Sequence, residues 1–170
     1  MRTVVARIGS IAALVLVAAD AVASGPVIVT PPGPNSASER QALIAAIELL
    51  PKAPVTVAVM DVGPARDGVR EYLLTLDVFI VRGNTVIYVV QQSGLLRRAR
   101  EGSAAHRAML AAVVWHEMSH LTGADEPHAR QAEEDLWTRF VRDNVIDQLT
   151  ALSWLRALKT RPDDQLLVSR

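Results

Sequence analysis

Residues 116–120 read His-Glu-Met-Ser-His, and this five-residue pattern decides how the rest of the chain is interpreted. It lies in the stretch 103–121, SAAHRAMLAAVVWHEMSHL, which begins with Ser103, a residue type that commonly caps the first turn of a helix. Gly123 follows this stretch and can adopt the left-handed backbone conformation that ends many helices. The sequence therefore predicts one helix over 103–121, with the two histidines one turn apart on the same face.

The spacing of the two histidines favours metal binding. Imidazoles at positions i and i+4 can hold one ion from adjacent turns, and catalytic zinc sites keep one position open for water. Zinc lowers the pKa of that water toward about 7, so that a nearby carboxylate can take its proton. We therefore expect His116 and His120 to hold Zn²⁺, and Glu117, which projects to the side of the helix, to act as general base during attack on a carbonyl.

Composition narrows the kinds of partner and of metal ligand. The chain has 170 residues, of which 50% are hydrophobic, and a formal net charge of +0. A balanced charge without a basic block argues against nucleic acid or an anionic lipid surface as the main partner. Cysteine is absent, which excludes disulfides, thiolate metal ligands and cysteine nucleophiles. Any metal must therefore be held by histidine and carboxylate side chains.

The N-terminal segment 1–23 has the pattern of a secretory signal. Two arginines accompany a short apolar run over 11–19, and Ala21-Val22-Ala23 supplies the small residues of a cleavage site. The apolar run is shorter than the ~20 residues of a membrane-spanning helix, so we expect cleavage after Ala23 and no span in the mature protein. The expected location is periplasmic or secreted, in a bacterium. The proline-rich segment 24–37 is predicted to be an extended linker.

Hydrophobic periodicity and turn residues predict a single α+β domain over 38–160, followed by a tail at 161–170. Strands are expected where β-branched residues gather between turn signals, at 55–62, 72–81 and 85–90. The last two should form an antiparallel hairpin within a small antiparallel sheet of about three strands. Besides the helix that carries the histidines, helices are predicted at 38–50, about 125–142 and 145–158.

A His-Glu-x-x-His helix preceded by an antiparallel sheet resembles the zincin metallopeptidases, and the run 116–137 is similar to uncharacterised exported bacterial proteins with the same motif. The resemblance covers about residues 40–140, and only the five-residue motif is specific. It implies a zinc metallopeptidase that hydrolyses peptide bonds. In zincins the strand before the active-site helix lies at the sheet edge and pairs with substrate, so the resemblance implies that 85–90 binds a peptide or protein substrate.

The third metal ligand must come from the residues that follow His120. Glu126 stands in a His-x-x-Gly-x-x-ligand spacing that resembles the metzincin branch, and we expect it to be the third ligand. The chain departs from that branch because no methionine follows Met118, so the methionine turn of the branch cannot form. Asp135 is a candidate to support a ligand histidine from behind. The alternative ligands lie on the following helix, in part as in the gluzincin branch: Glu133, Glu134 and His128.

A second interpretation is a zincin fold that binds metal or peptide without catalysis. The chain is small, and the part after the motif leaves little material to wall a deep cleft. A zinc-loaded protein that cleaves no peptide would favour this interpretation over a peptidase.

Overall fold

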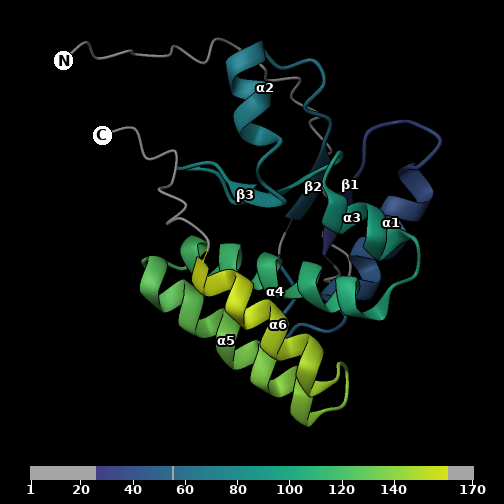
Figure 1. The fold of residues 1–170 in the computed structure, drawn as a ribbon. Helices are drawn as coiled ribbons and strands as arrows, with labels where there is room; N and C mark the ends of the chain where they lie inside the picture. Colours follow the sequence, from purple (N-terminus) through teal and green to yellow (C-terminus); the bar gives the residue numbers. More distant parts are fainter. Residues whose placement is uncertain (1–25, 55, 161–170) are drawn as a thin grey trace.

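The computed structural model describes residues 26–54 and 56–160, so the predicted signal segment 1–23 and the predicted tail 161–170 lie outside the described residues. Within them the chain forms six helices and one four-stranded sheet (Figure 1), which confirms the predicted α+β class. In chain order the elements are β1 (Val27–Val29), α1 (Ser36–Ile47), β2 (Thr56–Met60), α2 (Asp67–Leu73), β3 (Val78–Ile80), β4 (Val86–Val90), α3 (Gly94–Arg100), α4 (Ala104–Leu121), α5 (Glu126–Arg142) and α6 (Gln148–Thr160). Over this part of the chain, no helix combines the length and the apolar character that crossing a bilayer requires.

The sheet is mixed rather than wholly antiparallel, and it has one strand more than predicted. Its order is β1-β2-β4-β3, with only β3 antiparallel to its neighbour. β1 lies inside the segment 24–37 that was predicted to be a linker, and α1 forms the crossover that makes β1 and β2 parallel. The linker prediction is wrong for Val27–Val29 because three residues are too few to show the alternation that marks a strand in sequence.

The prediction of a strand over 72–81 holds only near its end. Residues Asp67–Leu73 form α2, and β3 is limited to Val78–Ile80. Short apolar runs do not distinguish a strand from a helix, because periodicity needs more residues than either element has here. The hairpin itself is confirmed, since Ile80 pairs with Ile87 across a turn in which Gly83 has a φ of 80°, a conformation that glycine adopts readily.

The strand that was expected at the sheet edge lies in the interior of the sheet. β4 pairs with β2 on one side and with β3 on the other, so its backbone has no free edge. The prediction that 85–90 accepts a substrate strand is therefore wrong. Sequence order suggested only the β3–β4 hairpin, whereas the pairing of β4 with β2 joins segments separated by α2 and β3. β3 is the edge strand at this end of the sheet.

The two faces of the sheet carry cores of different size. Alternate side chains along β2 and β4 point to one face and pack against α1, α3 and α4, and they include Val57, Val59, Ile87 and Val89. The other face carries a smaller cluster closed by α2, made of Val62, Leu73, Phe79 and Val90. Packing against the larger core therefore fixes the position of α4 on the sheet.

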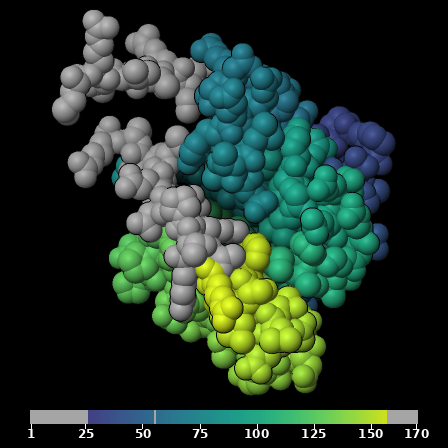
Figure 2. Space-filling model, in the orientation of Figure 1, coloured from purple at the N-terminus to yellow at the C-terminus, as the bar shows by residue number. Residues whose placement is uncertain are grey.

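α4 is the central helix of the molecule. It contacts β3 and β4 on one side and α5 on the other (Figure 1). Residues 110–114 are all buried, as expected for a helix segment that is covered all round. α5 packs through Trp137, and α6 lies against α5, as the yellow and green parts of Figure 2 show. The last turns of α4, which carry the His-Glu-x-x-His pattern, are partly exposed, as is its first turn.

Candidate metal centre

Two histidines at the end of α4 face each other. His116 and His120 are one turn apart, and the distance between their Nε2 atoms is 3.1 Å. The helix that holds them begins as predicted, with Ser103 accepting a hydrogen bond from the backbone of the first turn. The side chains of His116 and His120 are only 13% and 6% exposed, so the protein rather than solvent determines how the rings are oriented.

The connection between α4 and α5 fixes the ring of His120. Gly123 has a φ of 95°, and its N–H donates to the carbonyl of His120, while the N–H of Ala124 donates to the carbonyl of Ser119, both at 3.0 Å. These two bonds form a Schellman ending, which confirms the predicted role of Gly123 as the stop of the helix. The carbonyl oxygen of Ala124 then lies 2.9 Å from Nδ1 of His120, and Asp125 caps the first turn of α5.

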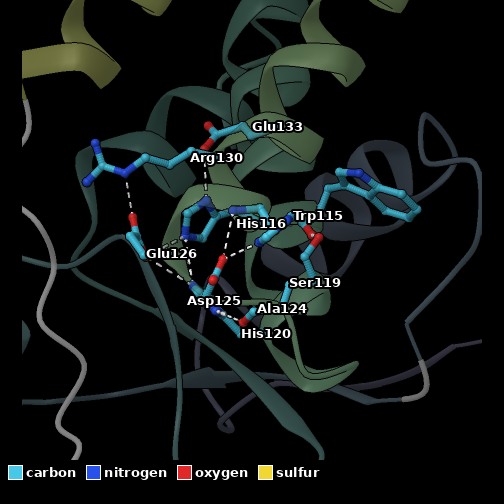
Figure 3. Close-up of polar contacts among 10 residues, drawn as sticks. Trp115, His116, Ser119, His120, Ala124, Asp125, Glu126, Arg130 and Glu133 are labelled. Atoms are coloured by element: carbon cyan, nitrogen blue, oxygen red, sulfur yellow. Dashed lines mark hydrogen bonds and ion pairs between the residues drawn. The ribbon is translucent and has the colours of Figure 1, made fainter.

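Glu126 is the first residue of α5, and the tight connection brings it onto the two histidines. Its Oε2 lies 3.2 Å from Nε2 of His120 and 3.5 Å from Nε2 of His116. Its other oxygen, Oε1, accepts a hydrogen bond of 2.6 Å from Nε of Arg130, one turn further along α5 (Figure 3). Burial raises the pKa of Glu126, but the Arg130 hydrogen bond and the nearby positive charges outweigh it, so that the pKa lies below its usual value.

The ring of His116 is held from behind by Glu133. Its Nδ1 lies 3.2 Å from Oε2 of Glu133, a side chain that is only 2% exposed. The contact is bent, so Nδ1 has no linear hydrogen bond, and Oε1 of Glu133 has no donor among the described residues. Burial lowers the pKa of His116, but the contact with Glu133 and the charges of Glu133, Glu117 and Glu126 outweigh it and raise the pKa above its ordinary value.

The three facing atoms have the spacing that a tetrahedral metal ion requires. The two Nε2 atoms and Oε2 of Glu126 are separated by 3.1, 3.2 and 3.5 Å. Zinc bonds of 2.0–2.1 Å at tetrahedral angles place neighbouring ligand atoms roughly 3.3 Å apart. Each Nδ1 faces an oxygen atom, and in the tautomer with the hydrogen on Nδ1 each Nε2 presents a lone pair toward the other two atoms. In that tautomer three acceptor atoms face one point, and this donor set fits a divalent metal.

The charges around the histidines also match a dication. Three carboxylates act on His116, namely Glu117, Glu126 and Glu133, and the guanidinium of Arg130 offsets one of them. Carboxylates that are buried or half-buried are unfavourable unless they are paired, and a bound cation would offset their charge.

The remaining candidate ligands lie elsewhere. Within the described part of the chain, the cluster of possible metal ligands consists of His116, His120 and Glu126. His128 is exposed and contacts the carboxylate of Asp125 instead. Glu134 is half-buried outside the cluster.

The carboxylate that contacts His116 from behind is not the one predicted from the sequence. Asp135, which was expected to support a histidine, is exposed and accepts a 2.9 Å hydrogen bond from Gln131. Glu133, which was considered as a ligand, makes that contact instead. The available signal was the spacing of positions 126, 130 and 133, which share one face of a helix.

Glu117 follows the first histidine on α4. Its side chain is half-buried, and its negative charge contributes to raising the pKa of His116. It therefore belongs to the electrostatic surroundings of the cluster, although it is not one of the three facing groups. This position is compatible with a carboxylate that handles a proton beside a metal rather than one that binds the metal.

Comparisons with known proteins found no match, so the function must be inferred from the geometry of the site. No family model, no curated protein and no solved structure matches this chain.

Proposed function

We propose that this chain is an exported zinc-dependent peptidase. The observation that carries the proposal is a set of three facing atoms within 3.5 Å of one another, one on Glu126 and two on histidines whose rings are both contacted from behind. His116, His120 and Glu126 would hold the ion. When bound, zinc would supply a Lewis acid that lowers the pKa of water and polarises a substrate carbonyl. The signal pattern at 1–23 supports a periplasmic or secreted location.

Glu117 is the proposed general base. Its carboxylate would take one proton from a water molecule while the water oxygen bonds to the carbonyl carbon of the substrate. It would then give this proton to the amide nitrogen as the carbon–nitrogen bond breaks, which releases a carboxylic acid and an amine. Arg130 keeps one oxygen of Glu126 engaged, so that only the other oxygen faces the histidines. The roles of the two glutamates thus stay separate.

The edge strand β3 is the proposed docking place for an extended substrate. The N–H of Val90 donates to the carbonyl of Asp77 at 2.9 Å, and opposite residues in an antiparallel ladder alternate between bonded and non-bonded pairs. Val78 and Ile80 therefore direct their backbone N–H and C=O groups away from β4. β3 contacts α4 and lies above the half of that helix that ends in the histidines (Figure 1). A peptide that pairs with β3 would pass beside the metal ligands.

The experiment that tests this proposal is cleavage of a library of fluorescence-quenched peptides by the zinc-loaded protein, with Glu117→Gln as the diagnostic variant. We expect the variant to keep its zinc and to lose about 10²- to 10⁴-fold in kcat/KM, the usual contribution of a general base. Glu134→Gln, a half-buried glutamate outside the cluster, is the matched control and should keep full activity. Full activity in Glu117→Gln would refute the general-base role. Stoichiometric zinc without cleavage of any peptide would favour a non-catalytic metal- or peptide-binding module.

A further inference from the structure

One face of α5 carries three charged residues toward the end of α4. Glu126, Arg130 and Glu133 are spaced by four and three residues, so they form one row along the helix. The first two contact each other, and Glu133 contacts the ring of His116 from the side opposite to Glu126 (Figure 3). Residues of this row therefore contact both ring nitrogens of His116, Glu126 at Nε2 and Glu133 at Nδ1.

The burial of Glu133 calls for a reason. The side chain is 2% exposed, and its Oε1 has no hydrogen-bond donor among the described residues. A buried carboxylate is costly unless it is paired, and its close contact here is the bent one with Nδ1 of His116. Packing of α5 does not require the charge, because Leu136, Trp137 and Phe140 already bury the helix in the core.

We propose that Glu133 is a positioning residue of the metal centre, which acts through His116 without touching the metal. The inference rests on the proposed metal site. The carboxylate of Glu133 lies 3.2 Å from Nδ1 of His116, where it favours the tautomer with the hydrogen on Nδ1 and directs Nε2 toward His120 and Glu126. The fixed negative charge behind the ring strengthens His116 as a donor and offsets part of the charge of a dication.

Glu133 cannot serve as a ligand in this arrangement. Its Oε2 lies against Nδ1, whereas the facing atoms of the cluster include Nε2 of the same ring, on the far side of the imidazole. His120 shows the matching arrangement, with its Nδ1 facing the carbonyl of Ala124 at 2.9 Å. A carboxylate supports one histidine and a backbone carbonyl supports the other, so only the first can be altered by substitution of a side chain.

The test compares Glu133→Ala and Glu133→Gln with Glu134→Gln in the full protein. Zinc affinity is measured by competition with a chelator, and the ligand geometry is followed through the visible spectrum of the Co²⁺-substituted protein. We expect zinc to bind Glu133→Ala about 10- to 100-fold more weakly, with a changed Co²⁺ spectrum. Glu133→Gln, which restores an acceptor without the charge, should recover part of the loss. Glu134→Gln should match the wild type.

The tautomer of His116 in the metal-free protein gives an independent readout by ¹⁵N NMR. The proposal requires the hydrogen on Nδ1 in the wild type and a loss of this preference in Glu133→Ala, or in Glu133→Gln if the alanine variant does not fold. A hydrogen on Nε2 in the wild type would overturn the proposal, as would a zinc affinity of Glu133→Ala within twofold of wild type. If the wild type binds no zinc, the proposed function fails, and the tautomer alone decides the role of Glu133.

Discussion

Replacing Gly123 with alanine tests the turn that brings Glu126 to the two histidines. Gly123 has a φ of 95°, and a Cβ built there would meet no atom within 4 Å, so the backbone conformation is the only expected cost. A residue with a Cβ loses about 1–2 kcal/mol in the left-handed region. The free energy of unfolding of the metal-free protein should fall by this amount. For a domain of this size, the loss corresponds to a decrease in Tm of about 3–8 °C.

The matched control is Gly68→Ala. Gly68 lies in α2, where a Cβ also meets no atom within 4 Å and φ is not positive. Alanine is the better helix former by up to about 1 kcal/mol, so this variant should be as stable as the wild type or slightly more stable. Both variants are compared by thermal unfolding in the presence of a chelator. A Gly123→Ala protein that unfolds at the wild-type temperature would refute the reasoning that this left-handed turn sets the geometry of the site.

Three further results are expected from other parts of the molecule. Glu39 is fully buried and accepts hydrogen bonds from Gln91 at 3.1 Å and from Arg100 at 3.4 Å. Glu39→Ala should therefore lower the free energy of unfolding, measured in urea, by about 2–4 kcal/mol. A loss below about 1 kcal/mol would contradict this prediction. The raised pKa of His116 means that its protonated form stabilises the metal-free fold below the ordinary histidine pKa and that this contribution disappears as the pH rises through the raised value. Zinc binds the neutral ring, so the measured affinity of the protein for zinc should increase about tenfold per pH unit between the ordinary histidine pKa and the raised pKa of His116. A flat profile of zinc affinity against pH would show that no such proton is displaced. Ile80→Pro removes an outward N–H of the edge strand without breaking a bond to β4, so it should raise KM for peptides with a small change in Tm; an unchanged KM would argue against docking on β3.

The local part of the fold could be predicted from the sequence because its signals are local. Ser103 and Gly123 mark the two ends of α4 through capping chemistry that depends on one residue each, and the structure places both ends there. The β3–β4 hairpin followed from its turn in the same way. Long-range features had no such signal. The strand β1 became recognisable only through its pairing with β2, and this pairing requires the crossover by α1.

In the candidate site, too, local sequence signals predicted some contacts and long-range packing determines the others. The i, i+4 spacing within one helix was sufficient to bring His116 and His120 together, and Glu126 follows after a turn that glycine determines. The role of Glu133 depends instead on the rotation of α5 about its axis and on its packing against α4, which no short motif encodes. The sequence favoured Asp135 for this supporting role and offered Glu133 and Glu134 only as alternative ligands, whereas the packing of α5 places Glu133 against His116.

The metal content of the purified protein tests the central claim most directly. Wild type and His120→Ala are dialysed against trace zinc and compared by elemental analysis, with His128→Ala as a control because His128 is exposed and lies outside the cluster. We predict about one zinc per chain in the wild type and in the control, and none above background in His120→Ala. A folded wild type without zinc, or a His120→Ala variant that keeps it, would contradict the account.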